Sequence, residues 1–573
     1  MKVKEMKSHP SALAAGFALS LLSASLAKAQ TPNIGDALRQ VPAAPTQLRS
    51  APELPAVGAS QFEPPMTKLP AAGPSITVQR IEFVGNREVN TAALQGQVAQ
   101  DLNKAYTLAE LENLASKLTR YYRSLGYFVA RVYIPEQKVS EGVITLRAVE
   151  GRYGKFILDN KSLVRDPIVQ GMLDDVKKYD IVSLDTLERA MLIINDTPGS
   201  KVVRADVMPG DAVGTSDFAV GTMADPKHEG FFLLDNHGTK ATGKSRASFN
   251  WDWNSPTGSG DRLSVSGLMS ERQGLLNGRL GYSTSLAPSG WRGEMAVGQT
   301  KYEVASGFFR TATPPRVTGT ADTLELGVTY PVRRIRAQTI EAALTYAHKQ
   351  LEDVVDSGPG ARLVTPKRSN AVTAGLNIRD EGFLAGWDGQ TQANFSLTAG
   401  ELGIKGEALQ TDQAAAGPRT HGNFAKVNVS LSRVSLLPEQ FSLTGALKVQ
   451  ETLGKNLDFT ERMGLAGVGG VMAYPSAELS GTNARFVRVE LARPLPQWEG
   501  LSSQWSVFTN WGQAQPTKQE AWRTLRDVGL GWTARHGNGV LLKAYLAHRL
   551  DRLPAQSEPT PRNKLWIQAG YIF

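Results

Sequence analysis

The sequence predicts a molecule in two parts, with small α/β units followed by an all-β barrel that closes within a membrane. Helical periodicity is confined to roughly residues 75–225, and from about residue 228 onward apolar and polar residues alternate instead. The last ten residues, 564–573, alternate throughout, which is about the length that a tilted strand needs to cross a bilayer. A lone strand would leave its backbone groups without partners in lipid, so it must belong to a closed barrel. A strand of a soluble sandwich is the alternative for this segment alone.

The composition narrows the class of protein. A chain of 573 residues is too long for one compact core, and 41% hydrophobic with 20% charged residues is close to an ordinary globular balance. After the amino terminus no run of 18 apolar residues occurs, which excludes a spanning helix there but not a barrel. The basic residues behind the formal charge of +9 are scattered, so we expect no nucleic-acid partner. The absence of cysteine fits an oxidising compartment.

The amino terminus predicts export. Lysines are followed by an apolar segment, Ala12–Leu26, and then by Ala27-Lys28-Ala29, the small-x-small pattern that a signal peptidase reads. We therefore expect residues 1–29 to be a signal peptide, with a short amphipathic helix as the alternative. An exported chain is not expected to use cytoplasmic nucleotides.

A short helix and a long linker follow, over residues 30–42 and 43–74. Asn33 can cap a helix that carries Asp36 in its first turn. The apolar residues of this helix recur at i, i+3, i+4 and i+7, as Ile34, Ala37, Leu38 and Val41. The helix is too short to be stable alone, so it is either a disordered end or docks elsewhere in the molecule. Nine prolines between residues 30 and 74 indicate a linker.

The first α/β unit is expected over residues 75–150. Its elements are a strand over Ile76–Val84, a weaker helix over Asn90–Leu102, a long helix from Leu108 to Leu125, and strands over Phe128–Ile134 and Val143–Val149. The long helix begins at a capping box formed by Thr107 and Glu110. It ends at Gly126, where a left-handed cap is needed.

The second unit, residues 151–225, repeats the order β-α-α-β-β. Its elements are a strand over Lys155–Leu158, helices over Pro167–Val176 and from Leu184 to Ile194, and strands over Lys201–Met208 and Ser216–Val220. Open sheet edges in such units suit strand addition by an extended peptide. The alternative is that both units are only spacers.

Residues 226–573 predict the barrel. In one segment Ala247, Phe249, Trp251 and Trp253 alternate with Arg246, Ser248, Asn250 and Asp252. Segments 392–399 and 425–432 alternate in the same way. One face is suited to lipid and the other to water, as in a wide barrel around a polar lumen. Tyr571 and Phe573 fall on the apolar face of the final strand.

No catalytic or cofactor site is predicted. Residues Gly238–Ser245 match the phosphate-loop pattern G-x-x-x-x-G-K-S, but this chemistry requires a helix directly after the loop. The segment Arg246–Trp253 reads as a strand, so we expect a hairpin between barrel strands. The seven histidines are isolated, which gives no metal site, and no serine-centred elbow occurs. We expect no enzyme activity.

Several motifs resemble those of one family. Tyr127-Phe128, Glu150-Gly151 and the spacing of Thr197-Pro198-Gly199 from Pro209-Gly210 resemble the two POTRA domains of two-partner secretion transporters, the TpsB family of haemolysin secretion/activation proteins. The segment from Gly469 to Pro475 resembles the signature loop of that family. The resemblance covers the whole mature chain, and it implies a plug helix at Ile34–Val41 and about 16 barrel strands.

The resemblance also implies a lid loop that folds into the barrel lumen. Its tip would consist of Val471, Met472, Ala473, Tyr474 and Pro475. In the family, a tip arginine is expected to pair with a barrel aspartate, whereas this chain has Met472 at the tip and Asn510 at the matching strand position. Losing one partner of a buried ion pair costs on the order of 3–5 kcal/mol, but losing both can be nearly neutral. The hypothesis is that packing of Met472 and Tyr474 holds the loop, with Asn510 as its barrel partner.

The implied function is passive secretion across the outer membrane of a Gram-negative bacterium. POTRA units in the periplasm would capture an unfolded, β-rich exoprotein of the TpsA type, a haemolysin or an adhesin, and pass it through the barrel without nucleotide or cofactor. The other implied partners are outer-membrane lipid and the outer-membrane assembly machinery, and the protein would be a monomer. A BamA-like outer-membrane protein insertase and a specialised porin are the alternatives.

Overall fold

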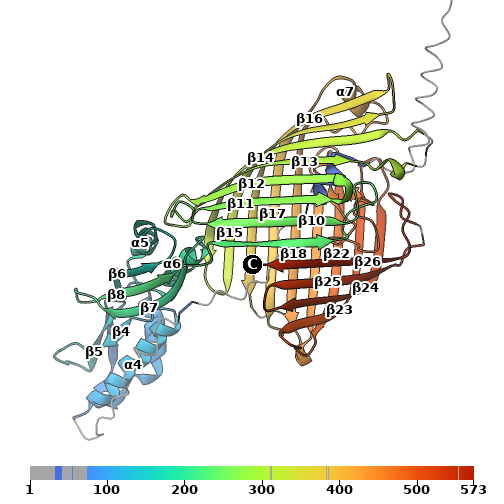
Figure 1. Ribbon diagram of the computed structural model, residues 1–573. Coiled ribbons are helices and arrows are strands. Elements are labelled where there is room, and N and C mark those ends of the chain that lie inside the picture. The colour runs from blue at the N-terminus through green and yellow to red at the C-terminus, as the bar shows by residue number, and fades with distance from the viewer. Residues whose placement is uncertain are drawn as a thin grey trace, which may run out of the picture.

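The computed structural model describes residues 32–41, 54–55 and 74–573, apart from residues 310, 312, 383, 385 and 553. It contains two α/β units in a row, followed by a barrel (Figure 1). The expected signal peptide and most of the linker lie outside the described residues. None of the helices in the described part of the chain has the length and apolar content that a membrane-spanning helix requires.

The first unit packs its helices on a small mixed sheet. Its elements are β1 Ile76–Val78, β2 Arg80–Val84, α3 Thr91–Val98, β3 Lys104–Tyr106, α4 Leu108–Ser124, β4 Arg131–Tyr133 and β5 Val143–Val149. β5 pairs in parallel with β2 and antiparallel with β4. The capping box forms as expected, with the Thr107 N–H donating to Glu110 at 2.7 Å, and Gly126 has a φ of 93°. The sequence analysis did not anticipate β3, and it made β4 too long.

The second unit has the same architecture. Its elements are β6 Arg152–Lys161, α5 Asp166–Asp174, α6 Leu184–Asp196, β7 Lys201–Pro209 and β8 Thr215–Met223. The sheet order is β6-β8-β7, with β6 and β8 parallel. Its core is made by the apolar faces of α5 and α6, where Leu173, Leu187 and Ile194 are fully buried.

Sixteen antiparallel strands form the closed barrel, which confirms the predicted fold. They are β9 His228–Asp235, β10 Arg246–Asn254, β11 Arg262–Ser270, β12 Leu275–Ser285, β13 Arg292–Glu303, β14 Arg316–Arg334, β15 Gln338–Asp356, β16 Arg362–Glu381, β17 Gly389–Ile404, β18 Gly422–Leu436, β19 Ser442–Thr452, β22 Asn483–Pro494, β23 Leu501–Gln515, β24 Arg523–His536, β25 Val540–Arg549 and β26 Asn563–Ile572. Neighbours in sequence pair with each other, and β26 pairs with β9 to close the ring.

The strands alternate between an apolar outer face and a polar inner face. On β26, Leu565, Ile567 and Tyr571 are exposed on the outside, whereas Trp566 points inward and is fully buried. Beyond the strand, the ring of Phe573 stacks on that of Tyr571, with the ring centroids 6.2 Å apart. This alternation follows from the period of two, because every second side chain of a strand lies on the same face of the sheet.

The two ends of the barrel differ. We call the end next to the second α/β unit, where β9 begins and β26 ends, the proximal end, and the opposite end the distal end. Strands are joined at the proximal end by turns such as residues 255–261, and at the distal end by longer connections such as 405–421 and 453–482. Residues 238–245 lie in the distal connection between β9 and β10, and the strand β10 follows them as expected.

Candidate functional site in the barrel lumen

The distal connection between β19 and β22, residues 453–482, folds back into the barrel. We call it the inner loop. It contains a two-residue hairpin, β20 Met463–Gly464 paired with β21 Ser480–Gly481. The predicted tip residues are all buried, and they pack with inward side chains of the strands that follow. These tip residues are Val471, Met472, Ala473, Tyr474 and Pro475.

Backbone groups of the tip are bound by two barrel strands. The Ala473 N–H donates to Asp527 Oδ2 of β24 at 2.7 Å. The Trp566 indole N–H of β26 donates to the Met472 carbonyl oxygen at 2.7 Å. A charge-assisted bond to a buried carboxylate is stronger than a neutral one. The tip is therefore tied to the wall through its main chain.

The side chain of Asn510 is hydrogen-bonded to Asp527 and not to the backbone of the tip. Its Nδ2 donates to Asp527 Oδ1 at 2.8 Å, and the two residues are register partners on β23 and β24. The sequence analysis named Asn510 as the barrel partner of the tip and did not identify Asp527, the carboxylate that the neighbouring strand places beneath the tip. Asp527 is the only acidic residue of β24 and lies on its polar face, which is the signal that could have identified it.

Tyr474 reaches a second carboxylate. Its hydroxyl donates to Asp551 Oδ2 at 2.9 Å, and the Arg549 guanidinium lies over its ring at 5.5 Å. Burial, together with Asp551, raises the pKa of Tyr474 above its ordinary value. The phenol is therefore a neutral donor at physiological pH.

The part of the inner loop that follows the tip is fixed by Glu478, which is 2% exposed. Its carboxylate accepts the backbone N–H groups of Gln556 and Ser557 at 2.9 and 2.8 Å, and Arg523 binds it at 3.1 Å. These contacts join the inner loop to the distal connection between β25 and β26. These hydrogen bonds offset part of the cost of burying the carboxylate.

The base of the inner loop is held by lysines from three barrel strands. Asp458 pairs with Lys367 of β16 at 2.6 Å. Glu461 pairs with Lys349 of β15 at 2.6 Å and Lys426 of β18 at 2.8 Å. Burial alone would raise the pKa of Glu461, but the two lysines outweigh it and lower the pKa below its ordinary value. The pairs therefore clamp the loop across the lumen.

The helix α2, Ile34–Arg39, packs between the barrel wall and the inner loop. Ile34 and Ala37 are each 1% exposed and pack with inward apolar residues of several strands. Leu38 lies at the edge of this cluster. Val41 lies beyond the helix, contrary to the predicted stripe. The physical reason is Pro42, which disfavours helical geometry in the residue before it.

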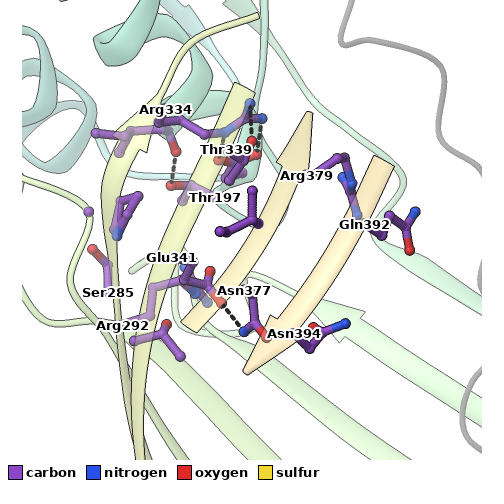
Figure 2. A pocket seen from close by; sticks show the side chains of 16 residues that line it. Thr197, Ser285, Arg292, Arg334, Thr339, Glu341, Asn377, Arg379, Gln392 and Asn394 are labelled. Atoms are coloured by element: carbon purple, nitrogen blue, oxygen red, sulfur yellow. Dashed lines mark hydrogen bonds and ion pairs between the residues drawn. The ribbon is translucent and has the colours of Figure 1, made fainter. Parts of the chain in front are cut away.

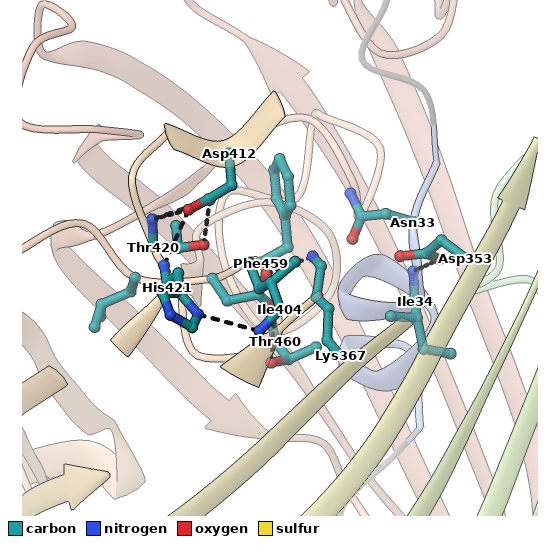
Figure 3. A network of polar contacts seen from close by, with 12 residues as sticks. Asn33, Ile34, Asp353, Lys367, Ile404, Asp412, Thr420, His421, Phe459 and Thr460 are labelled. Carbon is teal, nitrogen blue, oxygen red and sulfur yellow. Dashed lines mark hydrogen bonds and ion pairs between the residues drawn. The ribbon is translucent and has the colours of Figure 1, made fainter. Parts of the chain in front are cut away.

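Both ends of α2 are bound by charges that complement its dipole. At the amino end the Ile34 N–H donates to Asp353 Oδ1 of β15 at 3.0 Å (Figure 3). At the carboxyl end the Arg246 guanidinium of β10 donates to the Gln40 carbonyl oxygen. A carboxylate at a helix amino terminus and a cation at its carboxyl terminus are each stabilising.

α2 also contacts the inner loop directly. The Arg39 guanidinium donates to the Phe459 carbonyl oxygen, and the Arg39 side chain pairs with Asp36. A methyl group on Gly35 would lie 2.6 Å from the Phe459 backbone, so only glycine allows this approach. The helix and the loop therefore form one packed unit inside the lumen.

At the proximal end, α6 of the second α/β unit docks against the barrel turns. Asp196 and Arg334 form a bidentate ion pair at 2.7 and 2.9 Å, and Glu188 pairs with Arg336 at 3.1 Å. Beside these pairs lies a cavity of ≈ 330 Å³ (Figure 2). In the described part of the chain, no group of three or more acidic, histidine or cysteine side chains could hold a metal ion.

Two family models match the chain. Residues 76–151 match the ShlB-type POTRA domain, and residues 214–534 match the haemolysin secretion/activation proteins ShlB/FhaC/HecB. The second match alone spans more than half of the sequence.

Similar proteins agree with these matches. The heme/hemopexin transporter protein HuxB of Haemophilus influenzae (strain 86-028NP) is 24% identical over 84% of this chain and 84% of its own length. The outer membrane transporter CdiB of Dickeya dadantii (strain 3937) is 24% identical over 73% of this chain and 72% of its own length. The solved structure of CdiB from Escherichia coli has the same fold, with a TM-score of 0.71 at 20% identity over 90% of this chain and 95% of that one.

Proposed function

The chain belongs to the haemolysin secretion/activation protein family ShlB/FhaC/HecB, and from this membership we propose how its lumen works in the secretion of an exoprotein partner. Like the family, it is an outer-membrane transporter whose amino-terminal POTRA units lie in the periplasm. The proximal end of the barrel is then periplasmic and the distal end faces the outside of the cell.

The proposed gate consists of α2 and the inner loop. The observation that carries this proposal is the direct contact of Arg39 and Gly35 with Phe459, because it makes the two elements leave the lumen together. In the resting state α2 is the plug and the inner loop, with its tip at Val471–Pro475, is the lid. The exoprotein must displace both before its extended chain can pass.

Recognition is proposed to take place on the POTRA units. Each has a small sheet with an open edge, β4 in the first unit and β7 in the second. An extended segment of the exoprotein adds to such an edge through main-chain hydrogen bonds. The exoprotein is proposed to be large and β-rich, of the haemolysin or adhesin type, and its folding outside the cell supplies the direction of transport without nucleotide.

The test compares the secreted and outer-membrane proteomes of cells with and without this chain. We expect one large extracellular protein to disappear while the outer-membrane profile stays unchanged. A general fall in many barrel proteins would instead identify an outer-membrane insertase. No change in either fraction would contradict secretion and leave a pore of another kind.

The gate is tested separately by planar-bilayer conductance of the purified chain. Removal of residues 30–42 is expected to raise the open probability, because the plug is then absent and the inner loop has lost its contacts with Arg39 and Gly35. A variant that keeps the wild-type conductance without α2 would contradict a plugging role.

A further inference from the structure

One part of the lumenal wall carries hydroxyl and amide groups in place of charges. The inward residues of β17 alternate with the exposed outer residues Phe395 and Leu397. These inward residues are Gln390, Gln392, Asn394, Ser396 and Thr398. On β18 the inward residues Asn428, Ser430 and Ser432 continue the same chemistry. The two strands therefore present uncharged donors and acceptors to the lumen.

Neighbouring residues on this wall are hydrogen-bonded across strands. Asn377 of β16 is the register partner of Asn394, and Asn394 Nδ2 donates to Ser430 Oγ at 3.1 Å. Asn428 Nδ2 donates to Gln450 Oε1 of β19 at 2.8 Å. We call the set Asn377, Gln392, Asn394, Ser396, Asn428 and Ser430 the polar strip.

The wall from β9 to β14 is different. Its inward side chains include ion pairs, Arg262 of β11 with Glu229 of β9 at 2.9 Å and Arg279 of β12 with Glu325 of β14 at 2.8 Å. These side chains are partly exposed to the lumen. Fixed charges of either sign would retain oppositely charged residues of a passing chain and repel those of like charge.

The polar strip connects the two ends of the path. Its proximal residues Asn377, Gln392 and Asn394 line one side of the ≈ 330 Å³ cavity beside α6, whose other lining residues include the charged Arg292, Glu341 and Arg379 (Figure 2). At the distal end β18 continues to Lys426, which binds Glu461 at the base of the inner loop. A chain that follows the strip therefore begins beside the second POTRA unit and arrives at the clamp that holds the inner loop.

We propose that the exported polypeptide slides in extended form along the polar strip, with the cavity beside α6 as its entry site. The inference rests on the proposed function and adds the path to it. Side-chain amides can donate to and accept from any extended backbone, whatever its side chains. Each such bond replaces a bond to water and has a small net free energy, so it orients the chain without stopping it.

The test uses site-specific disulfide cross-linking, for which the chain is suited because it contains no cysteine. The probe is the exoprotein identified by the proteome comparison, with a single cysteine placed ahead of a tightly folding domain that halts its passage. Asn394→Cys and Ser430→Cys sample the polar strip. Ser264→Cys, an inward residue on β11, is the matched control on the charged wall.

We expect several-fold more cross-linked product at Asn394→Cys and Ser430→Cys than at Ser264→Cys. Equal or stronger cross-linking at Ser264→Cys would overturn the proposed path. Secretion of the exoprotein without the halting domain shows that each variant folds, and Gln392→Cys replaces any variant that fails. If transport is normal but the cross-links form at other positions, the proposed path along the polar strip is wrong and the proposed function stands. If the exoprotein reaches the medium in cells that lack this chain, the proposed function itself is wrong.

Discussion

At the residue scale, Asp527 is the centre of the contacts beneath the inner-loop tip. It accepts from the Ala473 N–H and from Asn510 Nδ2, and both donors are buried with it. Met472 contributes its carbonyl oxygen to Trp566 rather than a charged side chain. The tip is therefore held by a carboxylate on the wall and neutral groups on the loop.

Replacing Asp527 with alanine is expected to loosen the inner loop. The change leaves two buried donors without an acceptor, at a cost of about 1–3 kcal/mol for each. The open probability in planar bilayers should rise and the Tm in detergent should fall. Asp252→Ala is the matched control, since Asp252 is an inward aspartate of β10 whose bond is to Asn250. Equal effects of the two variants would contradict a specific role for Asp527.

A double-mutant cycle tests whether the tip and Asn510 are energetically coupled. Asn510→Asp alone is expected to lower the Tm, because it places a second carboxylate beside Asp527. In the unaltered protein the Asn510 Nδ2 lies 2.8 Å from Asp527 Oδ1 and donates to it. Met472→Arg introduces a cation at the tip, and the double variant should recover much of the loss. Purely additive changes in the free energy of unfolding would show that the two positions do not interact.

At the element scale, α2 and the inner loop are short segments that become stable only through contacts within the lumen. An isolated helix of six residues has little stability in water. Asp353 and Arg246 bind its two ends, and Phe459 of the inner loop packs against Gly35. The position of α2 is thus coupled to that of the loop.

Gly35→Ala is expected to weaken this coupling. The new methyl group would meet the Phe459 backbone at 2.6 Å, so the helix or the loop must shift. Single-channel recordings should show more frequent openings. Gly96→Ala in α3 is the control, since nothing lies within 4 Å of the added methyl group there. Unchanged gating in Gly35→Ala would contradict the contact.

The base of the inner loop should respond to acid. The folded state lowers the pKa of Glu461, so its stabilising contribution is fully present above the ordinary value of 4.5 and is lost as the pH falls through the lower folded-state pKa. Conductance should therefore be constant near neutral pH and rise only in strong acid. Glu461→Gln is expected to open more at neutral pH and to lose part of the acid response. An acid response identical to wild type would exclude Glu461 as its source.

At the scale of the whole molecule, the second α/β unit is attached to the barrel by side chains as well as by the polypeptide. Asp196 of α6 binds Arg334, and Glu188 binds Arg336. These pairs place the end of α6 beside the cavity where the polar strip begins. The orientation of the unit and the entry site are therefore coupled.

Breaking the pair between α6 and the barrel is expected to slow secretion. Asp196→Ala leaves the mostly buried Arg334 without its carboxylate, and exchanging the charges as Asp196→Arg with Arg334→Asp should restore part of the rate. Asp206→Ala is the control, because Asp206 pairs with Arg204 on the exposed strand β7. The measurement is the rate at which the exoprotein appears in the medium. A normal rate in Asp196→Ala would contradict a role for this attachment.

The sequence by itself determined the features that depend on local period and capping. Thr107 and Glu110 begin α4, Gly126 ends it, and the alternation of residues 564–573 predicts a barrel strand, because each signal needs only neighbouring residues. The tertiary structure alone decided which groups meet in the lumen. Asp527 lies beneath the tip because β23 and β24 pair in one particular register, and Glu461 binds lysines of β15 and β18 because the closed ring brings them together. Such contacts join residues far apart in the chain, and no local pattern encodes them.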